Sequence, residues 1–134
     1  MGGPVTPSDD GAGVPIAEAA GLTGVGVHTL RYYEGQQLLD VPRTAAGRRR
    51  YGPRELAAVR FIAQLRKTGM PIGVIREYAA TVRNGTSTSE TSLRLLEAHR
   101  ATVEANLAEQ QEYLRSISAK IDFYRAQLAD TTDV

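Results

Sequence analysis

Arginine and tyrosine side chains gather in two short blocks between residues 28 and 51. The first block is HTLRYYE at 28–34 and the second is GRRRY at 47–51, with Arg43 between them. A guanidinium group offers a planar fork of donors that fits phosphate oxygens and guanine edges. A tyrosine offers a rigid ring that ends in a hydroxyl group. Side chains of these types on two neighbouring elements indicate contacts with a nucleic-acid backbone and with base edges.

Two short helices are predicted to position the first block. Residues 15–21 form the first helix, which begins at a proline and is predicted to end at Gly21. Residues 26–36 form the second helix, with Val27 and Leu30 turned inward. A glycine-bearing segment at 21–25 joins them. Helix, turn and helix in this order indicate a helix-turn-helix.

The exposed face of the second helix carries the candidate contacts. His28, Arg31 and Tyr32 stand at positions i, i+3 and i+4 and therefore share one face. We expect this face to enter the major groove of a duplex. Tyr33 has two open interpretations, a contact with DNA or a place in the small core.

A short two-stranded wing is predicted between residues 40 and 50. Pro42 and Gly47 lie between extended ends, which is typical of a tight hairpin. The run of arginines at 48–50 is also typical of a solvated, phosphate-seeking surface. Both interpretations lead to a polyanionic partner.

The two blocks together resemble the MerR family of bacterial transcription regulators. Members of that family read approximately T-L-R-Y-Y-E-x-x-G-L-L in the first helix-turn-helix and R-x(3)-G-Y-R-x-Y in the wing. This chain has Gln37 where the family has glycine, and Arg48 where it often has tyrosine. The resemblance implies that DNA is contacted by His28, Thr29, Arg31, Tyr32, Tyr33, Arg43, Arg48, Arg49, Arg50 and Tyr51.

A second helical pair is predicted at residues 53–68 and 71–84. Arg66 and Lys67 at the turn between them are either phosphate contacts or a solvated helix end. The run from Gln64 to Tyr78 resembles AdhR-like MerR regulators, which respond to aldehyde and electrophile stress. Gln64 stands where that subgroup has a cysteine and cannot form an adduct with an electrophile. The subgroup's sensing chemistry is therefore not expected here.

One long helix is predicted from Leu93 to Leu128, after a loop at 84–92. About 36 residues at about 1.5 Å each would reach about 54 Å, which is more than a small head can cover. The apolar seam therefore predicts a second copy of the chain rather than a fold back onto the head. The seam does not distinguish parallel from antiparallel pairing, whereas the family resemblance implies an antiparallel coiled coil. The predicted dimerisation residues are Val103, Leu107, Leu114, Ile117, Ile121, Tyr124 and Leu128.

Composition limits the alternatives. Residues 31–67 hold nine basic and three acidic side chains, although the whole chain carries a net charge of +1. Cysteine is absent, which excludes disulfides and thiolate metal sites. The two histidines, His28 and His99, lie on different predicted elements, and no glycine-rich phosphate loop is present. We expect no enzyme activity, no metal and no cofactor. No apolar run is long enough to span a membrane and no signal peptide is recognised, which predicts a cytoplasmic protein.

The expected architecture is mainly α, a winged helix-turn-helix head followed by a dimerising coiled-coil helix. The predicted boundaries are a disordered arm at 1–13, the head at 14–84, the coiled coil at 88–129 and a tail at 130–134. The expected function is transcription regulation by a homodimer on pseudo-palindromic promoter sites. The resemblance implies distortion of spacer DNA and an indirect effect on RNA polymerase. The alternative is a regulator with a small-ligand pocket where head and coiled coil meet. Tyr78, Tyr113 and Phe123 either line this pocket or, as is more typical of such residues, pack in the core or the seam.

Overall fold

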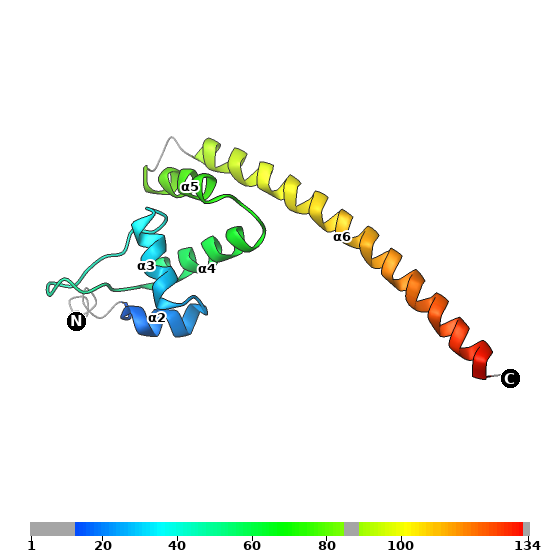
Figure 1. Ribbon diagram of the computed structural model, residues 1–134. Helices are drawn as coiled ribbons and strands as arrows, with labels where there is room; N and C mark the ends of the chain where they lie inside the picture. The colour runs from blue at the N-terminus through cyan, green and yellow to red at the C-terminus, as the bar shows by residue number, and fades with distance from the viewer. Residues whose placement is uncertain (1–12, 85–88, 133–134) are drawn as a thin grey trace, which may run out of the picture. The chain divides into compact units, whose positions relative to one another are not determined.

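The protein is mainly helical, as predicted. The computed structural model describes residues 13–84 and 89–132 (Figure 1). These residues form α2 (Ile16–Thr23), α3 (Val27–Gly35), α4 (Pro53–Lys67), α5 (Ile72–Asn84) and α6 (Ser89–Thr132). The chain divides into two compact units, residues 1–95 and 96–134. The predicted arm, apart from Gly13, and the last two residues of the predicted tail lie outside the described residues.

The first helical pair forms, but α2 extends beyond the glycine that was predicted to end it. Gly21 stays inside the helix, where glycine is tolerated at a cost of about 1 kcal/mol. Gly24 ends the helix instead, because it adopts a left-handed φ of 74° and its N–H bonds the carbonyl of Ala20. The Thr23 hydroxyl accepts a hydrogen bond from the Val25 N–H at 3.2 Å and so fixes the turn into α3.

The core of the head lies between α2, α3, α4 and α5. Leu30 is fully buried and Val27 is half-buried, so the predicted inward face of α3 is confirmed. Glu55 accepts a hydrogen bond from the Gly52 N–H at 2.9 Å, which caps the start of α4 just before Pro53. The buried hydrophobic side chains are Ala19, Val25, Leu30, Tyr33, Leu38, Leu39, Val41, Tyr51, Val59, Ile62, Leu65, Met70, Ile75 and Ala79.

The wing is smaller than the predicted pair of strands. Arg43 and Arg49 form one isolated antiparallel bridge, and no strand is assigned among the described residues. The Arg50 N–H donates to the Pro42 carbonyl at 2.9 Å, and Gly47 turns the chain with a φ of 84°. Pro42 has no N–H to return a bond to Arg50, so the ladder of hydrogen bonds is interrupted at this point.

The base of the wing is bonded to the start of the head. Val14 and Tyr51 exchange two backbone hydrogen bonds, of 2.9 and 2.8 Å. A side chain at Gly13 would meet the Tyr51 carbonyl carbon at 2.8 Å, so this close approach requires glycine. The ordered head therefore begins by Gly13, within the stretch predicted to be a disordered arm.

The unit at residues 96–134 is helical throughout its described part. Its helix, α6, is 44 residues long and begins at Ser89, four residues before the predicted start (Figure 1). Residues 85–88 of the predicted loop lie outside the described residues. Five of the predicted seam residues are more than half exposed within one chain: Leu107, Leu114, Ile117, Tyr124 and Leu128. No described helix has the length and apolar character needed to cross a membrane.

Candidate nucleic-acid interface

The outer face of α3 presents the polar side chains predicted from the sequence. His28, Arg31 and Tyr32 are exposed, while Thr29 is half-buried. Leu30 on the opposite side anchors the helix in the core. The N-cap of the helix is Gly26, which has no side chain to accept a hydrogen bond from the first N–H groups. Such an end, together with an exposed arginine, suits phosphate oxygens.

The wing is fixed to α3 through Glu34. One carboxylate oxygen accepts a hydrogen bond from Arg43 at 3.1 Å, and the other accepts one from the Nε of Arg49. Arg43 also donates to the Gly47 carbonyl at 3.2 Å. The bond to Glu34 raises the pKa of Arg49 above its ordinary value. The helix α3 and the wing therefore form one bonded surface.

Glu34 joins the wing to α3, and the sequence analysis did not single it out as a site residue. It belongs to the quoted family pattern, but its two partners lie 9 and 15 residues further along the chain. The available signal was an acidic residue among many arginines, since a carboxylate in such surroundings is usually paired.

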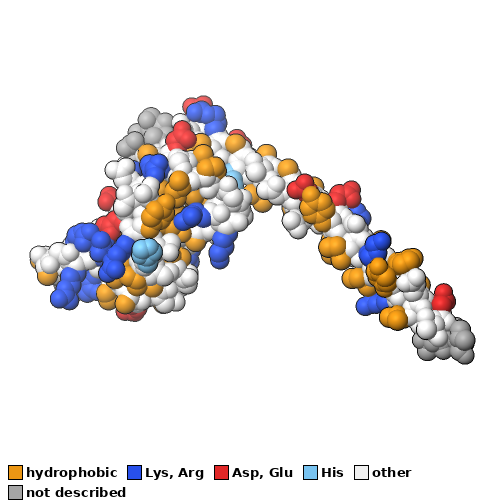
Figure 2. Space-filling view, viewed as in Figure 1, with side chains coloured by type: hydrophobic (Ala, Val, Ile, Leu, Met, Phe, Trp, Pro, Cys, Tyr) orange, Lys and Arg blue, Asp and Glu red, His pale blue; other side chains and the backbone are white. Residues whose placement is uncertain are grey.

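The remaining wing arginines differ in exposure. Arg48 is exposed, and its backbone N–H bonds the Thr44 hydroxyl at 3.2 Å. Arg50 is half-buried. Figure 2 shows Lys and Arg side chains gathered on the head around this region.

Two of the predicted contacts have buried side chains; for Tyr33 this was one of the two open interpretations, and for Tyr51 it corrects the expected exposed side chain. Tyr33 is 3% exposed and Tyr51 is fully buried, so both belong to the core. A head this small needs large aromatic rings to fill its core, so these two rings are buried rather than exposed on the surface. Burial is the main cause that raises the pKa of Tyr51, followed by the nearby Glu34 charge. The two tyrosines therefore lie in the core, beneath the exposed arginines of α3 and the wing.

The end of α4 meets the outer face of α3. Arg66 and Lys67 are both exposed in the last turn of α4, where positive charges interact favourably with the helix dipole. The Arg66 guanidinium lies over the Tyr32 ring, 5.9 Å from its centroid. The second helical pair is thus brought to the same face as the first.

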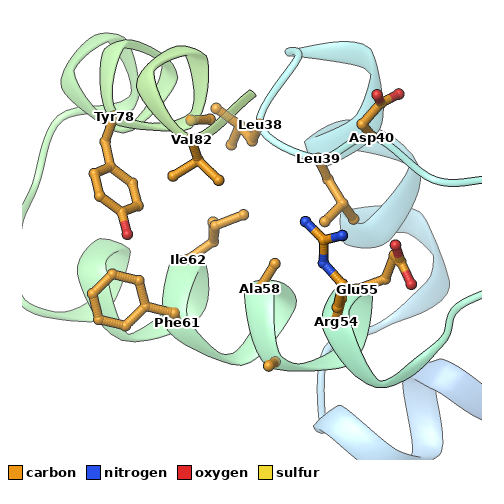
Figure 3. Close-up of a pocket in the computed structure, with 12 residues that line it drawn as sticks. Leu38, Leu39, Asp40, Arg54, Glu55, Ala58, Phe61, Ile62, Tyr78 and Val82 are labelled. Atoms are coloured by element: carbon orange, nitrogen blue, oxygen red, sulfur yellow. The ribbon is translucent and has the colours of Figure 1, made fainter. Parts of the chain in front are cut away.

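A cavity of about 370 Å³ lies elsewhere in the head, between α4, α5 and residues 38–40 (Figure 3). Phe61 and Tyr78 approach from α4 and α5 with ring centroids 5.8 Å apart. Tyr113 and Phe123, the other residues of the predicted ligand pocket, are exposed on α6 in the second unit. Among residues 13–84 and 89–132, no cluster of three or more potential metal ligands occurs.

Helical pair, wing and long exposed helix define a winged helix-turn-helix DNA-binding protein. Residues 14–81 match the family model described as MerR HTH family regulatory protein, and residues 56–130 match the model described as MerR, DNA binding. The chain belongs to the MerR family of DNA-binding transcription regulators. The narrower AdhR-like resemblance stays a prediction.

Relatives and solved structures agree with this membership. An uncharacterized HTH-type transcriptional regulator of Haemophilus influenzae is 33% identical, covering 81% of this chain and 82% of the relative. The transcriptional regulator ZntR of Escherichia coli K12 is 33% identical, covering 76% and 74%. A putative MerR family regulator from Listeria monocytogenes has a TM-score of 0.84 at 31% identity, covering 90% and 92%. HiNmlR, a MerR family regulator lacking the sensor domain and solved bound to promoter DNA, has a TM-score of 0.80 at 31% identity, covering 87% and 94%.

Proposed function

We propose that the chain regulates transcription as a homodimer bound to pseudo-palindromic promoter DNA. Each head would place α3 in the major groove and its wing on the adjacent backbone. The observation that carries the proposal is the polar face of α3 bonded to the wing through Glu34. The proposed contact residues are His28, Thr29, Arg31, Tyr32, Arg43, Arg48, Arg49, Arg50, Arg66 and Lys67.

The proposed dimer uses the exposed stripe of α6. Val103 is half-buried, and Leu107, Leu114, Ile117, Ile121, Tyr124 and Leu128 are exposed in one chain. Covering each such side chain contributes about 1.5–3 kcal/mol before the entropy cost of association. The proposed division assigns residues 14–84 to DNA binding and residues 88–129 to an antiparallel coiled coil, as in the family. Two-fold symmetry of the pair supports an operator with inverted half-sites.

The proposed mode of action is distortion of promoter DNA. A dimer that contacts two half-sites can bend or twist the spacer between them, and phosphate contacts offset a deformation cost of a few kcal/mol. RNA polymerase would then be affected through the DNA. We propose that the protein works in the cytoplasm without catalytic chemistry, because DNA is its partner and membership in a family of regulators supports this role. HiNmlR, solved with promoter DNA, supports the same partner.

The test begins with a duplex that the wild-type chain enriches from a random-sequence library. The proposal expects tighter binding to this duplex than to a scrambled duplex of the same length and composition, and an inverted repeat in its sequence. Equal binding to both duplexes would contradict sequence-specific recognition.

Wing contacts are tested with Arg48→Ala. Because Arg48 is exposed and expected to touch phosphate, its loss should weaken binding to both duplexes alike and lower the salt slope by about one. Arg94→Ala, which removes an exposed arginine at the start of α6, is the matched control and should leave the slope unchanged. Arg49→Ala should also reduce the preference for the enriched duplex, because Arg49 holds Glu34 as well. An unchanged slope in Arg48→Ala would remove the wing tip from the contact surface.

A further inference from the structure

The C-terminal end of α3 turns in an unusual way. Gln37 has a φ of 62° and is the only non-glycine residue with positive φ among those that the structure describes. Its N–H donates to the Glu34 carbonyl at 3.0 Å, and the Leu38 N–H donates to the Tyr33 carbonyl at 2.9 Å. These two bonds make a Schellman turn, in which the left-handed position usually holds glycine. A side chain at this position makes the turn less favourable by itself.

Two arginines of α5 hold this turn. Arg76 donates from Nε to the Gln36 carbonyl at 3.0 Å and from Nη2 to the Gln36 side-chain oxygen. Arg83 donates from Nη1 to the Gln37 carbonyl at 2.8 Å. The arginines are seven residues apart, which places both on one face of α5. One helix therefore binds two successive residues at the end of another.

The two arginines of α5 are chemically complementary to the C-terminal end of α3. Gln36 is the C-cap of α3, and its carbonyl, like the other last carbonyls of a helix, carries a partial negative charge and has no partner inside the helix. Arginine provides positive charge and, at Arg76, two donors in fixed geometry. Arg76 is half-buried, which favours a bond of defined geometry over a solvated side chain.

The same turn sets the path to the wing. Leu38 and Leu39 follow it directly and are 3% and 6% exposed, so the chain leaves α3 along a fixed core route. The wing begins four residues later at Arg43 and returns to α3 at Glu34. A shift of the turn would therefore move both DNA-facing elements.

We infer that Arg76 and Arg83 are positioning residues for DNA recognition, which hold the C-terminal turn of α3 so that recognition helix and wing meet the duplex together. Their guanidinium groups act through the carbonyls of residues 36 and 37. The inference rests on the proposed function, since it assigns a role within the same DNA-binding head. It predicts that these arginines set the preference for the operator rather than the general affinity for DNA.

The experiment compares Arg76→Gln, Arg83→Gln and the wild-type chain on the enriched and scrambled duplexes. Binding to the enriched duplex should weaken about tenfold, the range for side chains that act through a neighbouring element, while binding to the scrambled duplex and the salt slope stay unchanged. Arg94→Gln removes an equal charge from the same unit and should change neither value. Arg76→Lys keeps the charge but not the paired donors, so it should give an intermediate loss.

Three results would overturn the inference. A salt slope lowered by about one would show that the arginine itself binds phosphate. Equal losses on both duplexes would show a general loss of folded head, and wild-type binding by both variants would show no positioning role. A wild-type chain without preference between the duplexes would instead contradict the proposed function.

A second variant tests the mechanism at the turn. Gln37→Gly should restore part of the lost preference in Arg83→Gln, because glycine adopts the left-handed conformation without the arginine's help. If the effects of Gln37→Gly and Arg83→Gln on the preference simply add, Arg83 does not act through this turn and is not a positioning residue.

Discussion

At the residue scale, one carboxylate organises the proposed DNA-binding surface. Glu34 binds both Arg43 and Arg49, whose side chains remain 44% and 27% exposed. Solvent still reaches both ion pairs, and pairs at a protein surface contribute only about 0.2–1 kcal/mol to stability. Their main effect is therefore on geometry, since they hold two wing arginines against the recognition helix.

Replacing Glu34 by glutamine should separate general affinity from specificity. The change removes a negative charge and releases two arginines, so binding to the scrambled duplex should tighten and its salt dependence should become steeper. Binding to the enriched duplex should gain less or weaken, because the wing is no longer held on α3. Fluorescence anisotropy titrations over a salt series measure both effects. Glu77→Gln removes an exposed charge from α5 as the control, and equal tightening on both duplexes would contradict the positioning role.

Tyr51 should limit stability at high pH. Its hydroxyl is buried without a hydrogen-bond partner among the described residues, so Tyr51→Phe should raise the free energy of unfolding by about 1 kcal/mol near neutral pH. Burial raises the pKa of Tyr51 above the ordinary 10.0 of an unfolded chain. The wild-type chain should therefore lose stability as pH rises above that value, because the unfolded state loses the proton first.

Urea unfolding across this pH range measures both parts of the Tyr51 prediction. Tyr113→Phe is the control, since Tyr113 is half exposed. A Tyr51→Phe variant with the same alkaline loss as the wild-type chain would show that other groups cause it.

At the element scale, the end of α3 should respond to the type of residue at position 37. Gln37→Gly should raise the free energy of unfolding by about 1 kcal/mol, because a left-handed residue with a Cβ is strained. Gln37→Ala keeps the Cβ and should not gain stability. Urea unfolding compares the three chains. Equal stability of the glycine and alanine variants would mean that the turn is not strained.

Local patterns predicted the helices but not all of their ends. The inward side of α3 at Val27 and Leu30 was readable because helical spacing places these apolar residues on one face. The end of α2 was misassigned because Gly21 and Gly24 look alike in sequence, and only backbone conformation distinguishes them. The wing was predicted, but the structure reduces it to one bridge, and Pro42 beside that bridge has no N–H to extend the ladder.

The arrangement of the candidate site could be predicted within one helix, but not where it depends on contacts between residues far apart in the chain. Arg31 and Tyr32 follow from their spacing on one helix face. Tyr33 and Tyr51 could not be assigned to the core with certainty, because an aromatic residue suits both a core and a DNA surface. The bonds from Arg76 and Arg83 span 40 and 46 residues, and no local pattern encodes such pairs.

At the scale of the whole molecule, the exposed stripe of α6 requires a partner. Leu114→Glu with Ile117→Glu should give monomers at micromolar concentration, because charges would be buried in the seam. Ser116→Glu with Ala119→Glu has the same spacing on the opposite helix face and should leave the dimer intact. Sedimentation equilibrium distinguishes these states. A surviving dimer in the first variant would refute the proposed seam.

The number of chains on one duplex tests the central proposal most directly. Sedimentation velocity of the protein with its enriched duplex, at modest ionic strength, measures that number. We predict two chains on each duplex, and loss of the complex when Leu114 and Ile117 are changed to glutamate. A single chain that sediments alone and leaves the duplex free would contradict the proposed function.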